Sequence, residues 1–324
     1  MNLFGFFRVS KKRDSHSLHY NDQDITNNLG DDDAMSNING GTWNSALYRV
    51  PLPGTSSVVV VKKLQNRSGS PVDASLDNRC QSEVNLLGSI HHDNIIGLAD
   101  CLRTNNFIVL IYNHKENGSL HRWLHPDLPQ LAAQGLVLDW PTRRNIAIGT
   151  VEGLCYLHHG RNHPIVHHNI NSASILLDTS LNPKIAGFDF ARINLAGPDQ
   201  PVPISELTAA NMFGYTAPEY VTMVTIKVDV YSIGVVLLEL VTGRLPNEPV
   251  LDGHLATWAQ NNCERLMEKT GDFSNVVDMV IPDRARYIKE MAAMFRLGVD
   301  CTVKKPEERP TIREGLFRLR NRCR

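Results

Sequence analysis

Apolar residues in the first part of the chain fall into short runs that predict two strands and one helix. Residues 58–61 are all valine, and a β-branched run of this kind favours a strand. Residues 76–90 carry apolar side chains at helical spacing, which predicts a helix. A second apolar strand is predicted over residues 107–112, followed by a turn at Asn117-Gly118-Ser119.

The rest of the chain has the pattern of a helical protein. Asp139 precedes Trp140 and Pro141, and an Asp cap with Pro in the first turn is typical of a helix start. Residues 230–241 are nearly all apolar, too short a run to span a bilayer, so they predict a buried helix. Amphipathic stretches near 285–300 and 311–322 predict two more helices.

This pattern predicts a small strand-rich lobe joined by a short segment to a larger helical lobe. Residues 14–37 are rich in Asp, Asn and Ser and show no sustained apolar period, which predicts a linker. At 324 residues, 42% hydrophobic and 21% charged, the chain is long enough for two packed lobes.

Charge and cysteine content narrow the function classes. The formal net charge is −1, and no basic stripe with interleaved aromatics occurs, so nucleic acid is not expected as a partner. The six cysteines are scattered, without the close pairs of a zinc site, which favours reduced thiols in a cytosolic protein.

The N-terminal segment is predicted to be a frayed tail. It has no run of about 18 apolar residues and no secretory pattern. Its short apolar start is followed by Arg8, Lys11, Lys12 and Arg13. The alternative for this basic segment is peripheral contact with an anionic inner leaflet of the membrane.

Several motifs occur in one order along the chain. Val59-Val60-Val61-Lys62 is followed, 21 positions after the lysine, by Glu83. Five further motifs lie in the helical part: Pro164–Asp178, Lys184–Asp189, Gly214–Tyr220, Lys227–Ser232 and Pro306–Pro310. Their order and spacing resemble those of protein kinases. The resemblance covers about residues 25–324 and is closest to plant receptor-like kinases of the leucine-rich-repeat receptor type.

This resemblance implies an α+β, two-lobed protein kinase fold with a small β-rich N-lobe and a larger helical C-lobe. It places a disordered, juxtamembrane-like tail at residues 1–26, the N-lobe at 27–112, a hinge at 113–116 and the C-lobe at 117–324. It implies that Lys62 and Glu83 form the ion pair that faces the nucleotide phosphates. Four further positions are implied to meet a nucleotide: Gly40, Val60, Tyr112 and Leu176.

The nucleotide positions depart from the kinase pattern. Of the three glycines of the phosphate-covering loop only Gly40 is kept, because Thr42 and Ser45 replace the others. Their side chains lie where backbone N–H groups must approach phosphate oxygens closely. Val60 replaces the alanine that usually packs on adenine, which narrows that pocket.

The positions that carry the chemistry depart further. Asn169 stands in place of the Asp base, and an amide cannot accept a proton at neutral pH. Asn171 replaces the lysine that steadies the transferring phosphate. Ser174 and Gly187 replace the two residues that hold magnesium.

Two alternatives to a complete loss of metal binding stay open. Gly187-Phe188-Asp189 reverses the usual D-F-G, so Asp189 could turn toward a metal; loss of ligand geometry is the default expectation. The histidines could hold a transition metal, although the resemblance implies structural roles for them, with His167 bonded to backbone. This second set consists of His158, His159, His163, His167 and His168.

The structural positions of the family are kept. Asp229 matches a buried carboxylate that anchors the catalytic loop, and Glu219 and Arg309 match a buried ion pair of the large lobe. Three residues fall where the family stacks an apolar column between its lobes: Leu87, His167 and Phe188.

The sequence therefore favours a catalytically inactive kinase, or pseudokinase, that binds protein partners such as an active receptor kinase or its substrates. It is expected in the cytoplasm, at the inner face of the plasma membrane, without magnesium and with at most weak ATP binding. Two alternatives stay open: a slow Ser/Thr kinase with an unusual metal arrangement, and a metal-independent ATP sensor that uses Lys62 and Glu83.

Overall fold

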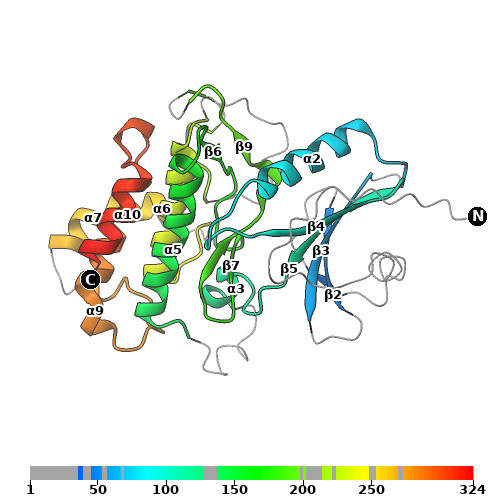
Figure 1. The fold of residues 1–324 in the computed structure, drawn as a ribbon. Helices are drawn as coiled ribbons and strands as arrows, with labels where there is room; N and C mark the ends of the chain where they lie inside the picture. The colour runs from blue at the N-terminus through cyan, green and yellow to red at the C-terminus, as the bar shows by residue number, and fades with distance from the viewer. Residues whose placement is uncertain are drawn as a thin grey trace, which may run out of the picture. The chain divides into compact units, whose positions relative to one another are not determined.

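The computed structural model describes ten stretches of the chain. These are residues 36–38, 45–52, 57–66, 69–126, 137–197, 200–201, 214–220, 224–247, 253–268 and 273–323. The chain divides into two compact units (Figure 1). The first is Met1–His91 with Ile96–Lys115, and the second is His92–Ile95 with Glu116–Arg324. The predicted tail over residues 1–26 lies outside the described residues.

Strands come mainly from the first unit and helices from the second. The strands are β1 (Ser36–Ile38), β2 (Ser45–Pro51), β3 (Val58–Gln65), β4 (Leu98–Arg103), β5 (Phe107–Asn113), β6 (Ile165–Val166), β7 (Ile175–Leu177), β8 (Pro183–Ile185) and β9 (Arg192–Ile193). The α-helices are α2 (Ala74–Gly88), α3 (Leu120–Leu124), α5 (Trp140–His159), α6 (Lys227–Thr242), α7 (Leu255–Glu268), α9 (Arg284–Cys301) and α10 (Ile312–Arg322). Two 3-10 turns are η2 (Phe188–Phe190) and η3 (Pro306–Glu308). The predicted α+β class is confirmed.

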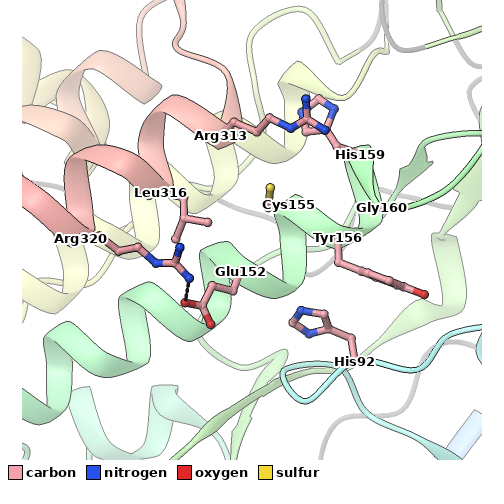
Figure 2. A pocket seen from close by; sticks show the side chains of 9 residues that line it. All are labelled: His92, Glu152, Cys155, Tyr156, His159, Gly160, Arg313, Leu316 and Arg320. Atoms are coloured by element: carbon pink, nitrogen blue, oxygen red, sulfur yellow. Dashed lines mark hydrogen bonds and ion pairs between the residues drawn. The ribbon is translucent and has the colours of Figure 1, made fainter.

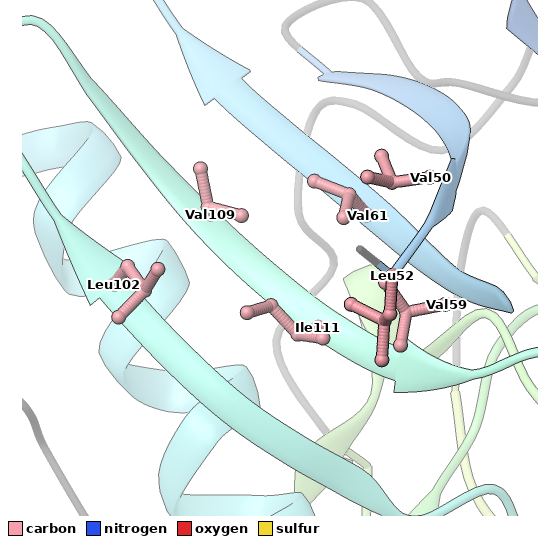
Figure 3. Close-up of a cluster of buried hydrophobic side chains, with 7 residues drawn as sticks. All are labelled: Val50, Leu52, Val59, Val61, Leu102, Val109 and Ile111. Carbon is pink, nitrogen blue, oxygen red and sulfur yellow. The ribbon is translucent and has the colours of Figure 1, made fainter. Parts of the chain in front are cut away.

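The first unit is built on one antiparallel sheet with strand order β1-β2-β3-β5-β4. Side chains alternate across a strand, and Val59 and Val61 of β3 enter a buried apolar cluster with Val109 and Ile111 of β5 (Figure 3). The side chain of Lys62, one position after Val61, therefore points to the opposite face of the sheet.

Helix α2 packs against this sheet and carries Glu83 among its buried residues. Asp73 begins the helix by accepting a hydrogen bond from the backbone N of Leu76 at 2.8 Å. The prediction extended this helix to residue 90, whereas α2 ends at Gly88 and Ser89 caps it through backbone bonds to Leu86 and Leu87.

Two short segments differ from the sequence prediction. Residues 36 and 37 were assigned to a linker, but Ser36–Ile38 forms β1 and pairs with Leu47–Arg49 of β2. Because β1 is held by backbone pairing, its residues need no alternating apolar pattern that a sequence-based prediction could detect. His92–Ile95, predicted within the small lobe, belongs to the second unit, where the backbone N of Ile185 donates to the carbonyl of Asn94 at 2.8 Å.

The second unit is organised around α6. Every residue of α6 from Val228 to Thr242 is buried, which confirms the prediction from residues 230–241. Helix α9 approaches α6 closely at glycines: a β-carbon added to Gly234 would lie 2.6 Å from Cβ of Cys301. A larger side chain at this crossing would separate the two helices.

Helix α5 and two small two-stranded sheets complete the part of the second unit that carries the site. Asp139 caps α5 by accepting from the backbone N of Thr142 at 2.9 Å, with Pro in the first turn, as predicted. β6 pairs with β9, and β7 pairs with β8. Among the described residues, no helix combines the length and apolar character needed to cross a membrane.

Candidate functional site

Lys62 and Glu83 form a buried ion pair in the first unit. Lys62 Nζ lies 2.7 Å from Glu83 Oε2, and the exposed fractions of the two side chains are 6% and 8%. The predicted pair is confirmed. Glu83 Oε1 also accepts a hydrogen bond at 2.7 Å from the hydroxyl of Tyr112, a contact that the sequence did not predict.

The other proposed nucleotide positions of this unit are only partly described. Val60 is half-buried on β3 and lies opposite Tyr112 of β5 in the sheet register. Gly40 and Thr42 lie outside the described residues. Ser45 begins β2 and pairs with Leu64.

In the second unit, Asp229 of α6 holds the segment that corresponds to the catalytic loop. Its carboxylate is fully buried and accepts from the backbone N of His167 at 2.8 Å and of His168 at 2.9 Å. His158 Nε2 lies 3.0 Å away. Burial alone would raise the pKa of Asp229, but the hydrogen bond and charge of His158 outweigh it and lower the pKa. The predicted anchor is confirmed.

This anchor fixes an unusual backbone. His168 has φ of 67°, in the left-handed region, which is costly for a residue with a side chain unless the surroundings enforce it. The two hydrogen bonds that Asp229 accepts supply that enforcement, because they fix the two peptide groups that precede the Cα of His168.

Asn169 and Asn171 lie side by side just after the anchor. Asn171 Nδ2 donates to Asn169 Oδ1 at 2.8 Å and to the Asn169 carbonyl at 3.1 Å. The amide at the base position is therefore hydrogen-bonded to the amide at the phosphate-lysine position. Neither group carries a charge or can accept a proton at neutral pH.

Ser174 and Gly187 are next to these asparagines. Ser174 Oγ donates to the Asn171 carbonyl at 2.9 Å and accepts from the Asn171 backbone N at 3.0 Å. A β-carbon added at Gly187 would lie 3.6 Å from both Asn169 Nδ2 and Ser174 Cβ. The four positions at which the kinase residues are replaced, called the degenerate positions here, therefore lie together in the second unit: Asn169, Asn171, Ser174 and Gly187. Gly187 contributes no side chain to this group.

Asp189, the proposed rescue ligand, lies in η2 directly after Gly187, which has φ of 80°. Leu176 is half-buried on β7.

The structural frame of the second unit matches the prediction. Arg309 donates to both oxygens of Glu219, at 2.6 and 2.8 Å, and its side chain is fully buried. His167 packs edge-on against Phe188 with ring centroids 4.7 Å apart, and its Nε2 lies 3.1 Å from the Ala186 carbonyl. Leu87 is buried in the first unit.

The remaining histidines of the alternative metal set have separate surroundings. His168 Nδ1 lies 3.0 Å from the Tyr220 hydroxyl. His163 is exposed. His159 lines a cavity of about 360 Å³ between α5 and α10, which is bordered by the ion pair of Glu152 and Arg320 (Figure 2). None of the four degenerate positions lines this cavity.

The first unit has a buried Lys–Glu pair on an antiparallel sheet and one helix. The helical second unit has a loop anchored by a buried Asp and a buried Arg–Glu pair. Together these features define a protein kinase domain. The chain belongs to the protein kinase domain family, whose match covers residues 40–318. The predicted kinase fold is confirmed.

The relatives with similar sequences include plant receptor-like kinases. The chain is 36% identical to Receptor-like protein kinase 5 of Arabidopsis thaliana over 321 residues, 96% of this chain and 30% of that protein. It is 35% identical to MDIS1-interacting receptor like kinase 1 of Arabidopsis thaliana, over 88% of this chain and 27% of that protein. The chain thus spans less than a third of the length of either relative.

A solved structure with a similar fold is the pseudokinase domain of BIR2, described as an immune regulator of the RLK/Pelle family. The TM-score is 0.70 and the sequence identity is 27%, covering 98% of this chain and 89% of that one. The expected relation to receptor-like kinases is therefore confirmed at the level of the kinase domain.

Proposed function

We propose that this chain is a pseudokinase domain that acts as a binding or regulatory module in phosphorylation signalling. The observation that supports it most is that Asn169, Ser174 and Gly187 replace the base and both metal ligands in one place. A positioned base alone contributes about 10²- to 10⁴-fold to a rate. The loss of metal ligands adds to that deficit because the metal neutralises the phosphate charge.

Magnesium does not fit the residues at this place. It prefers an octahedral set of oxygens that includes carboxylates, but Gly187 offers no side chain and Ser174 Oγ is bonded within its own loop. Lys62 and Glu83 could still meet a phosphate group. We therefore expect weak ATP binding at most, and no gain from magnesium.

A thermal-shift titration tests this expectation. ATP is added up to millimolar concentration, with magnesium in one series and with a chelator in the other. Ligand at its dissociation constant adds about 0.4 kcal/mol, a rise in Tm of about 1 °C for a chain of this size. We expect a rise no larger than this in either series, and the same result for Lys62→Met.

The two alternatives give different outcomes. A clear rise in the chelated series that Lys62→Met abolishes would support the metal-independent ATP sensor. A magnesium-dependent rise, together with radiolabelled autophosphorylation near about 1 s⁻¹, the low end for kinases, would overturn the pseudokinase proposal and support the slow kinase.

Restoring the lost groups tests which of them matter. Groups that act as one unit have non-additive effects, so Asn169→Asp alone should stay inactive. Weak activity is expected only from the combined variant Asn169→Asp, Asn171→Lys, Ser174→Asn, Gly187→Asp and Asp189→Gly. A folded five-fold variant that binds magnesium-ATP and stays inert would instead place the defect in the loop residues Thr42 and Ser45 and in Met212, which stands where these kinases usually carry Ser or Thr.

The proposed partner is a protein, either an active receptor kinase or one of its substrates, met in the cytoplasm at the inner face of the plasma membrane. Support comes from the receptor-like kinase relatives and from the regulatory description of the BIR2 pseudokinase. Isothermal titration of this chain against an active receptor kinase domain tests it. The membrane contact predicts that neutralising Arg8, Lys11, Lys12 and Arg13 abolishes sedimentation with phosphatidylserine vesicles.

A further inference from the structure

Two histidines and a glutamate of the second unit, none of which is one of the degenerate kinase positions, present ligand atoms to one another. His121 and His125 come from the turn of α3, where the backbone N of His125 donates to the His121 carbonyl at 2.8 Å. Glu239 comes from the last turn of α6. One ligand atom from each of the three lies within 4.8 Å of the other two.

The spacing of the histidines explains why they meet. Residues four apart on a helical turn share one face, and the ring centroids of His121 and His125 are 4.9 Å apart. His125 Nε2 already lies 3.0 Å from Glu239 Oε1.

The carboxylate of Glu239 is held from behind by two hydroxyl groups. Tyr215 donates to Oε2 at 2.7 Å, and Ser172 donates to Oε1 at 3.0 Å. Both hydroxyls are neutral, and Glu239 is fully buried. Among the described residues, His125 is the one basic side chain within ion-pair distance of this carboxylate. A buried carboxylate without a strong cation beside it is costly, so the place favours a positive charge.

We propose that His121, His125 and Glu239 bind one zinc ion. Two imidazoles and one carboxylate form a known donor set for Zn²⁺, with water as the fourth ligand. Ligand atoms around a tetrahedral zinc are about 3.3 Å apart, given bonds of about 2.0–2.1 Å. The His125–Glu239 pair already meets this spacing, and closing the third corner requires a shift of His121, which is only half-buried.

Tyr215 and Ser172 complete the site by orienting the carboxylate, as hydrogen-bonded groups behind metal ligands commonly do. Zinc fits better than magnesium or calcium, which prefer sets made of oxygen atoms. The ion would join α3 to α6, beside a residue of the catalytic-loop segment, since His121 Nδ1 lies 3.2 Å from Ser172 Oγ. The competing description is a hydrogen-bonded core network that holds no metal.

The test is isothermal titration of the chelator-treated full chain with ZnCl₂, supported by the visible spectrum of Co²⁺ in place of zinc. We expect one equivalent bound, with the intense bands of tetrahedral cobalt. The variant H121Q/H125Q should bind zinc at least about 100-fold more weakly, and Ser172→Ala about 10-fold more weakly. The control variant H91Q/H163Q makes the same two changes at exposed histidines and should bind as the unmodified chain does.

Two results would overturn the proposal. One is the absence of a single-equivalent zinc isotherm in the unmodified chain. The other is equal weakening in the control and in H121Q/H125Q, which would indicate adventitious binding at surface histidines. If the double variant does not fold, the single variant His121→Gln changes one of the two half-buried ligands. Its circular dichroism must match the unmodified chain, and unchanged zinc affinity there would also refute the site.

Discussion

The imidazole of His167 should make the stability of the domain fall as the pH drops from neutral. The ring is fully buried, its Nε2 donates to the Ala186 carbonyl, and its Nδ1 accepts from the backbone N of Asn169 at 3.2 Å. Both contacts need the neutral ring with its proton on Nε2. Burial is the main reason that the pKa of His167 is lowered to about 4, although Asp229 acts in the opposite direction.

The magnitude follows from the difference between the folded and unfolded pKa values. An unfolded histidine has a pKa of 6.5, so between pH 6.5 and pH 4 the unfolded chain binds a proton that the folded chain does not. Stability from this group is complete above pH 6.5 and declines as the pH falls. The full loss is about 3 kcal/mol, and at pH 5 it is about 2 kcal/mol.

Urea denaturation at pH 7 and at pH 5 measures this loss. The variant His167→Gln keeps a donor for the Ala186 carbonyl but does not titrate. The unmodified chain should lose about 2 kcal/mol more than this variant between the two pH values. Exposed His163→Gln is the control and should behave as the unmodified chain does. Equal pH-dependent losses in the chain and in His167→Gln would refute the assignment.

Other groups do not obscure the comparison. Burial also lowers the pKa of His168, which acts in the same direction in every variant. The pKa of Asp229 is lowered from 3.8, so its contribution is present above that pH and is lost only below it.

Three further substitutions should lower the stability at neutral pH, each measured by urea denaturation. Arg309→Met should cost about 3–5 kcal/mol because it removes the buried guanidinium that donates to both oxygens of Glu219; a second change, Glu219→Gln, should recover part of that loss. Tyr112→Phe should cost about 1 kcal/mol, since Glu83 keeps its lysine but loses the phenol donor; no change would contradict the hydrogen bond. Gly187→Ala should cost about 1–2 kcal/mol through its φ of 80° and not through crowding, because the added β-carbon would meet Asn169 and Ser174 at 3.6 Å, an ordinary contact distance.

Strong local patterns made the core elements predictable from the sequence. The valine run forms part of strand β3, the apolar residues 230–241 of α6 are all buried, and Asp139 caps α5 as its residue type suggests. Asp229 and Arg309 were placed through family motifs, and their partners are those expected.

Features that depend on distant pairing could not be predicted. β1 exists through backbone bonds to β2, which leave no mark on residue type. The contact of Tyr112 with Glu83 requires a sheet register and a helix position together. Similarly, His125 and Glu239 lie 114 positions apart, so no spacing rule links them.

The retained pair of Lys62 and Glu83 has less bearing on nucleotide binding than its motif suggests. Both groups are buried, and removing one partner of such a pair takes away the counter-charge that lies 2.7 Å from the other buried group, which costs several kcal/mol. A chain that never meets ATP would therefore still be destabilised by losing either residue. Asn169, Ser174 and Gly187 face no such penalty, because their hydrogen bonds are satisfied within the loop or absent. A substitution at Lys62 or Glu83 therefore lowers the stability of the fold more than a substitution at Asn169, Ser174 or Gly187 does. For this reason a preserved Lys62 is compatible with a domain that has no catalytic function. Only a nucleotide titration that distinguishes Lys62→Met from the unmodified chain separates stability from binding.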